Sequence, residues 1–150
     1  MGSVRIYEIP RCTMAASGCA LFGEGPLERF SAWFSARPAT MFPRDFLWYD
    51  AERGGFVWYY MLSEGESAPS GFGSVDFAGG LYAVATGPDQ QPSDDVHAAI
   101  DAFIAAHPGL ERDDTRAELG NIVTSPAACS ALGYHQMDYY VPVRAVQSRA

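Results

Sequence analysis

The chain has 150 residues and a formal net charge of −8, with 48% hydrophobic and 19% charged residues. This size and composition are typical of a folded globular domain. The acidic balance argues against direct nucleic acid binding, and no apolar run reaches the length of a membrane span. All ten basic residues are arginine, which excludes lysine-dependent pyridoxal phosphate and nucleoside triphosphate sites.

Residues 4–14 alternate as a strand that is interrupted at Pro10. Pro26 suits the first turn of a helix, and Pro38 ends that helix, because the residue before a proline avoids helical geometry. Four apolar side chains fall near one face of this helix, which predicts that it packs on a sheet. They are Leu27, Phe30, Trp33 and Phe34.

A hairpin is predicted next, with strands at residues 46–49 and 56–62 around a turn at 50–55. The polar, proline-containing segment 63–70 is the best linker candidate and lies near the middle of the chain. This position divides the chain into halves of about 1–65 and 70–150.

The second half opens with residues 75–77, and Gly79-Gly80 then predicts a bulge or a tight backbone approach at the entry to the next strand. Ser93 is the expected cap of the clearest helix, which stops at residues 107–109. The remaining elements are strands at 81–86, 117–123 and 137–143 and a short capped helix at 125–133.

Two segments of the first half are echoed in the second. Residues 12–18 resemble 81–87, and residues 57–61 resemble 137–141. Each half also places one amphipathic helix between its first and later strands. The sequence therefore predicts an α+β fold of duplicated strand–helix–strand–strand units, whose antiparallel sheet forms a central ligand groove.

The three cysteines are odd in number and lack close pairing, so we expect free thiols in a reducing cytoplasm. No basic segment followed by an apolar stretch marks a secretory signal. The three histidines have no metal-ligand spacing, and no nucleophilic serine motif is present. We therefore expect no metal, no cofactor and no catalytic set of these types.

Aromatic side chains are the main candidates for ligand contacts, because aromatic faces can hold cationic or aromatic compounds. Any one of them could instead be an ordinary core residue. The candidates on the predicted strands are Trp48, Trp58, Tyr60, Tyr82, Tyr139 and Tyr140.

Two acids, Glu118 and Asp138, interrupt the apolar strands of the second half. A carboxylate on a half-buried strand needs a partner or a ligand, unless it points to water. An acid among tyrosines would favour cations and flat rings. Both residues are therefore candidate ligand-binding groups.

The segments 4–10 (VRIYEIP), 77–86 (FAGGLYAVAT) and 137–143 (MDYYVPV) resemble the GyrI-like effector-binding family. This family includes the ligand domains of some AraC- and MerR-type multidrug regulators. The resemblance spans nearly the whole chain.

The resemblance implies two duplicated units around a groove that binds amphipathic, often cationic, aromatic compounds. It also implies a buried glutamate on the strand after the second helix, where Glu118 is the nearest match. Gly120 is the alternative alignment, which would leave Asp138 as the acid. Tyr82 and Tyr140 match aromatic pocket positions.

The leading hypothesis is a cytoplasmic small-molecule binding domain, either alone or as the ligand-sensing part of a transcription regulator. It would bind neither nucleic acid nor membrane itself, and a homodimer is expected from base rates. One alternative is a hydrolase of electrophilic natural products that uses Glu118 as general base and a tyrosine. The other is a protein-interaction module.

Overall fold

The computed structural model describes residues 3–89 and 93–147, which form nine strands and three helices. The chain divides into two compact units. Residues 1–9 and 80–150 make unit 1, and residues 10–79 make unit 2. The α+β class with antiparallel strands, predicted from the sequence, is confirmed in both units.

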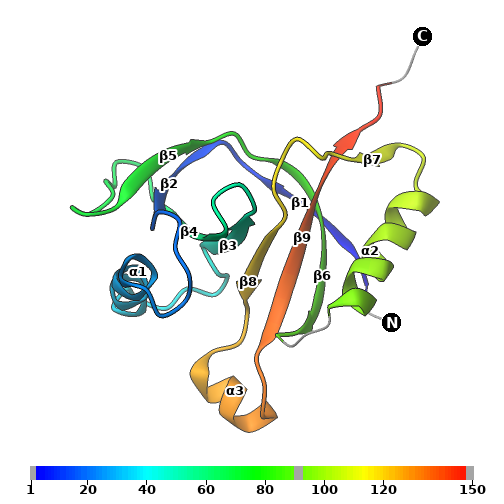
Figure 1. Ribbon diagram of the computed structural model, residues 1–150. Helices are drawn as coiled ribbons and strands as arrows, with labels where there is room; N and C mark the ends of the chain where they lie inside the picture. The colour runs from blue at the N-terminus through cyan, green and yellow to red at the C-terminus, as the bar shows by residue number, and fades with distance from the viewer. Residues whose placement is uncertain (1–2, 90–92, 148–150) are drawn as a thin grey trace. The chain divides into compact units, whose positions relative to one another are not determined.

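Unit 2 is a four-stranded antiparallel sheet in the order β3-β4-β2-β5 with one helix. Its helix begins with a proline in the first turn, as predicted, and packs beside β4 (Figure 1). The elements are β2 (Cys12–Ala16), α1 (Gly25–Ser35), β3 (Asp45–Asp50), β4 (Gly55–Met61) and β5 (Gly73–Phe77).

The core of unit 2 lies between α1 and the sheet. Phe30 is fully buried and contacts the rings of Trp33, Trp58 and Phe72, with ring centres 5.1 to 5.4 Å apart. Burial of these large rings contributes to the hydrophobic stabilisation of this unit.

Unit 1 has the sheet order β8-β9-β6-β1, and the short strand β7 also pairs with β9. Figure 1 shows α2 lying along this sheet, where it contacts β6, β7 and β9. The elements are β1 (Arg5–Ile9), β6 (Gly80–Pro88), α2 (Asp94–Ala106), β7 (Leu110–Arg112), β8 (Leu119–Ile122), α3 (Pro126–Leu132) and β9 (Gln136–Ala145).

Two details of unit 1 differ from the sequence prediction. The hydroxyl of Ser93 makes no capping hydrogen bond, and its carbonyl instead accepts from the backbone N–H of His97 at 3.2 Å. The strand β7 was not predicted, because three residues carry too little periodicity to be recognised. The cap of α3 is as predicted: the Ser125 hydroxyl accepts from the backbone N–H of Ala128, and Gly133 follows with φ of 85°.

Close packing explains two glycines of β6. Gly80 has φ of 132°, and a Cβ there would lie 2.5 Å from the Arg116 side chain, which agrees with the predicted tight approach. A Cβ at Gly87 would lie 2.3 Å from Val96, so this glycine lets α2 approach the sheet closely.

The two units share one strand order, because β3-β4-β2-β5 corresponds to β8-β9-β6-β1. The echoed segments occupy matching places, in β2 and β6 and in β4 and β9. The outer strands are exchanged along the chain: β1 precedes β2 but pairs with β6, and β5 precedes β6 but pairs with β2. The division into halves of about 1–65 and 70–150 within one domain stays a prediction.

None of the helices formed by residues 3–89 and 93–147 has the length and apolarity needed to cross a membrane.

Candidate functional site

Alternation along β6 and β9 gives the sheet of unit 1 two different faces. Ala83, Ala85, Val141 and Val143 pack against Ile100 of α2. Because successive side chains of a strand point to opposite faces, the residues between them lie on the face opposite α2. We call this the tyrosine face, and it carries Arg5, Tyr7, Tyr82, Thr86, Asn121, Asp138 and Tyr140.

Three tyrosines form a row across this face. The ring centres of Tyr7 and Tyr140 are 6.4 Å apart, and those of Tyr140 and Tyr82 are 6.1 Å apart in an edge-to-face arrangement. Tyr82 is 1% exposed and Tyr140 is 7% exposed, whereas Tyr7 is 39% exposed on the outer strand β1. Burial thus increases from Tyr7 to Tyr140 and Tyr82.

A buried carboxylate lies beside the tyrosines. Asp138 is 7% exposed, and its Oδ1 accepts hydrogen bonds from Thr86 Oγ1 at 2.5 Å and from Arg5 Nη2 at 2.9 Å. The Arg5 guanidinium also donates to Tyr7 Oη at 2.7 Å and lies over the Tyr7 ring. A buried charge requires such compensation, and here an arginine provides it.

The phenol of Tyr140 is held in its neutral form. Asn121 Nδ2 donates to Tyr140 Oη at 3.3 Å, and burial raises the pKa of Tyr140 to about 12. At the other end of the row, the guanidinium of Arg116 lies 4.8 Å from the centre of the Tyr82 ring. The tyrosine face therefore combines neutral hydroxyls, one carboxylate and two guanidinium groups.

A cavity of about 430 Å³ opens at the ends of β6 and β9. It is lined by Thr86, Gly87, Pro88, Tyr134 and Gln136. Thr86 also holds the Asp138 carboxylate, so the cavity adjoins the charged part of the tyrosine face. A volume of this size falls in the range of small-molecule sites.

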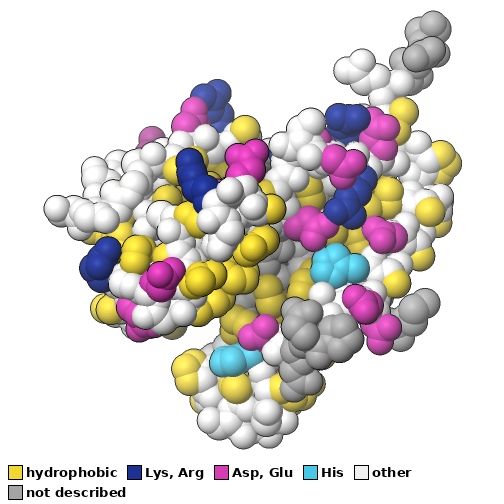
Figure 2. All heavy atoms as spheres, viewed as in Figure 1, with side chains coloured by type: hydrophobic (Ala, Val, Ile, Leu, Met, Phe, Trp, Pro, Cys, Tyr) yellow, Lys and Arg dark blue, Asp and Glu magenta, His cyan; other side chains and the backbone are white. Residues whose placement is uncertain are grey.

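The second predicted acid, Glu118, lies in a different cluster. It precedes β8, its side chain is 38% exposed, and its carboxylate pairs with Arg112 and lies 3.3 Å from His97 Nε2. Figure 2 shows such basic, acidic and histidine side chains gathered at the surface beside α2. Glu118 is thus tied to surface ion pairs, and the structure does not group it with Tyr82 and Tyr140.

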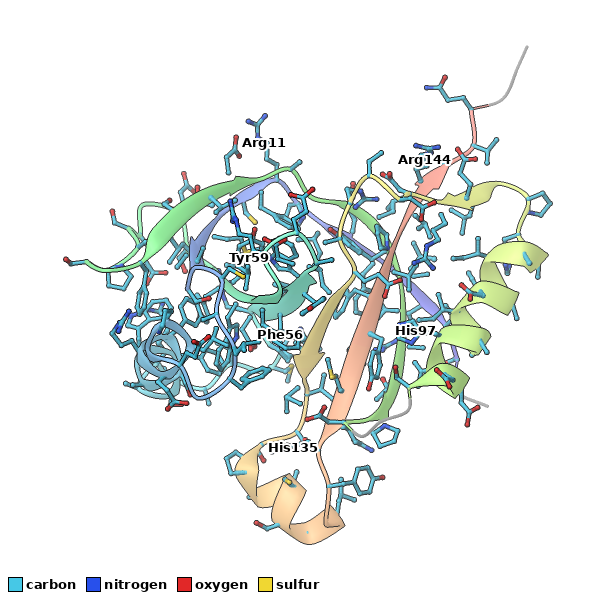
Figure 3. All side chains as sticks on the ribbon, in the orientation of Figure 1. Arg11, Phe56, Tyr59, His97, His135 and Arg144 are labelled. Atoms are coloured by element: carbon cyan, nitrogen blue, oxygen red, sulfur yellow. The ribbon has the colours of Figure 1, made fainter. Side chains whose placement is uncertain are left out.

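Tyr139 points the opposite way from Tyr140. Its hydroxyl donates to the carbonyl of Pro88 at 3.0 Å, and its ring centre is 5.5 Å from that of His97 on α2 (Figure 3). It belongs to the core between α2 and the sheet.

The predicted residues of unit 2 also divide between two faces. Trp58 and Tyr60 pack against Phe34 of α1, and Trp58 Nε1 donates to Asp45 Oδ2 at 2.9 Å. Trp48 lies on the face opposite α1, where its ring centre is 6.0 Å from that of Tyr59 (Figure 3).

The structure therefore brings together three of the eight predicted residues: Tyr82, Asp138 and Tyr140. Trp58, Tyr60 and Tyr139 pack against helices, Trp48 lies on a face of unit 2, and Glu118 lies in the surface cluster. Whether any of them binds a ligand stays a prediction.

Sequence reasoning missed Arg5, Tyr7, Thr86, Asn121 and Tyr59. Among these, Arg5 pairs with the buried carboxylate of Asp138. The alternation of residues 5–9 places Arg5 and Tyr7 on one face, which was the available signal. Their partners on β6 and β9 could not be read from the sequence.

Among residues 3–89 and 93–147, no group of three His, Cys, Asp or Glu side chains is arranged to hold a metal ion. No protein-family model matches the sequence, and a search of curated proteins finds no match either.

Solved structures do resemble this one. The C-terminal domain of EcmrR has a TM-score of 0.63 at 9% identity and covers 97% of this chain and 99% of that chain. EcmrR in a complex with DNA has a TM-score of 0.63 at 10% identity, and the match covers 97% of this chain and 58% of that chain. SAV2435 bound to tetraphenylphosphonium has a TM-score of 0.54 at 7% identity, and the match covers 95% of this chain and 94% of that chain. The chain therefore shares the fold of the EcmrR C-terminal domain. Identities this low establish the fold alone.

Proposed function

We propose that this chain is an effector-binding domain that binds amphipathic aromatic small molecules, cations among them, on the tyrosine face of unit 1. The observation that carries the proposal is the buried Asp138 carboxylate beside the row of Tyr7, Tyr140 and Tyr82. A carboxylate supplies charge, and tyrosine faces supply flat apolar contact and cation–π attraction.

The structural neighbours support this assignment by analogy of fold. One neighbour is bound to tetraphenylphosphonium, a bulky aromatic cation, and another was solved in a complex with DNA. We propose that this chain is the ligand-sensing domain of a cytoplasmic transcription regulator of the AraC or MerR type. The domain itself would contact ligand rather than DNA, which agrees with its net charge of −8.

Calorimetric titration with tetraphenylphosphonium tests this proposal, using the wild type, Asp138→Asn and Glu118→Gln. Both variants remove one negative charge, so nonspecific attraction of the cation changes equally in each. We expect Asp138→Asn to weaken binding about tenfold, the size of one lost charged contact. Glu118→Gln should bind as the wild type does.

Weakening by Glu118→Gln alone would move the site to the surface cluster beside α2. Equal weakening by both variants would mean that the cation responds only to net charge. Either result contradicts the proposed site.

A protein-interaction function is the second candidate, because unit 2 exposes several large apolar side chains. Among the described residues these include Leu21, Phe22, Met41, Phe42 and Tyr49. Sedimentation of the wild type and of Phe22→Ser distinguishes self-association, including the expected homodimer, from a monomer. A monomer in both cases would remove the self-association form of this candidate.

A further inference from the structure

Arg5 occupies the position on Asp138 that a cationic ligand would need. Its Nη2 lies 2.9 Å from the Asp138 carboxylate and 3.1 Å from the Thr86 hydroxyl. Its Nη1 donates to Tyr7 Oη, and its guanidinium carbon lies 5.0 Å from the centre of the Tyr7 ring. One guanidinium thus uses both the carboxylate and an aromatic face, the two features that attract organic cations.

The other end of the tyrosine row is also covered by an arginine. Arg116 lies over the Tyr82 ring and is anchored through Nη2 to the carbonyls of Leu81 and Val143 and through Nε to Asp113. Its side chain is 21% exposed. This anchoring makes Arg116 a fixed part of the face.

Arg5 is held less completely. Its side chain is 36% exposed, compared with 9% for its partner Asp138, and it extends from the outer strand β1. The carboxylate is therefore buried, while part of the Arg5 side chain is accessible to solvent. Displacement of Arg5 breaks the ion pair with Asp138 and the hydrogen bonds to Thr86 and Tyr7, and a ligand cation can replace the ion pair.

We propose that Arg5 is a specificity-determining residue, which competes with the cationic group of a ligand for Asp138 and so lowers the preference of the site for aromatic cations relative to aromatic anions. This inference rests on the proposed function and goes beyond it, because it assigns the control of ligand charge to one residue. A cation that binds at Asp138 Oδ1 must displace Arg5, because Nη2 of Arg5 already donates to that oxygen. An aromatic anion can bind beside Arg5, where the positive charge of the guanidinium attracts it.

Two probes of nearly equal shape and opposite charge test the proposal: tetraphenylphosphonium and tetraphenylborate. Calorimetry would measure both affinities for the wild type, Arg5→Gln and Arg11→Gln. Arg11 is a matched control, because it also pairs with an aspartate, Asp76, but in an exposed ion pair of unit 2 (Figure 3). Each variant removes one positive charge from the chain.

We expect Arg5→Gln to strengthen tetraphenylphosphonium binding about fivefold and to weaken tetraphenylborate binding by about the same factor. Arg11→Gln should leave the ratio of the two affinities at its wild-type value. Tyr7→Phe is a milder second variant that keeps every charge and removes one acceptor of Arg5. It should shift the ratio toward the cation by about twofold.

A ratio unchanged in both Arg5→Gln and Tyr7→Phe, with binding intact, would overturn the role of Arg5 and leave the proposed function standing. An equal shift in Arg11→Gln would also overturn it. Failure of every variant to bind either probe would instead reject the proposed function, and this inference with it.

Discussion

The two units share a strand order but differ in the sheet face turned away from their helix. In unit 1 this face carries the tyrosine row with a buried ion pair at Asp138. In unit 2 the corresponding face is apolar and aromatic along the middle of its strands. Its side chains include Met14, Phe46, Trp48, Val57, Tyr59 and Phe77.

This difference shows that two units with the same strand order can carry different side chains on the sheet face opposite the helix. Strand order and helix packing are kept in both units, which maintains a stable scaffold. The face opposite the helix is free to differ, since it does not hold the helix in place. On this face, one unit carries polar and charged groups, and the other carries apolar and aromatic side chains.

The largest expected effect compares the stability contributed by the two hydrophobic cores, each of which lies between a helix and its sheet. Phe30→Ala in unit 2 should lower the free energy of unfolding by about 4 kcal/mol, and Ile100→Ala in unit 1 by about 3 kcal/mol. Both side chains are fully buried, and Phe30 also loses three ring contacts. Urea unfolding measures both values. A larger loss for Ile100→Ala would mean that unit 1 has the more tightly packed core.

A second pair of variants compares the two faces of unit 2. Trp58→Phe removes the hydrogen bond to Asp45, a carboxyl whose pKa is raised by burial and lowered in part by that same bond. We expect a loss of about 2 kcal/mol. Trp48→Phe should cost about 1 kcal/mol or less, since the buried Trp48 Nε1 makes no hydrogen bond within the described residues. Equal losses in chemical denaturation would contradict the assignment of these two rings.

The smallest effect concerns the polar character of the tyrosine face at high pH. The pKa of Tyr140 is raised to about 12, whereas a tyrosine in an unfolded chain has a pKa of about 10. Between these values the native state keeps a proton that the unfolded state releases, so stability falls as the pH rises above about 10. Tyr140→Phe should reduce this slope. Ultraviolet absorbance of tyrosinate measures the pKa of Tyr140, and unfolding curves at several pH values measure the slope of stability against pH.

Much of the framework could be predicted from the sequence. The stripe of Val96, Ile100 and Ile104 identified α2, and Pro26 marked the start of α1. These signals are local, because they depend on residues within a few turns of one another. No local signal of this kind marked the short strand β7 or the exact ends of several strands.

The candidate residues were harder to place, because several of them lie on strands with aromatic side chains on both faces. Residues 57–61 contain no polar position, so alternation cannot show which aromatics face the helix. Trp58 and Tyr60 were chosen, yet they pack on α1, and Tyr59 lies on the opposite face. For the same reason Tyr139 and Tyr140 were predicted to line one site, although their side chains lie on opposite faces of the sheet. The pairing of Arg5 with Asp138 spans 133 positions of the chain, which no local pattern reveals.

The exchange of outer strands has a consequence for the order in which the molecule is made. The strand β1 is synthesised first, but its neighbour β6 comes after the whole of unit 2, and β9 comes near the end of the chain. A growing polypeptide can therefore complete unit 2 while β1 still waits for its partners. The carboxylate of Asp138 meets Arg5 only after β9 has left the ribosome, so a product that ends before β9 would lack this pair.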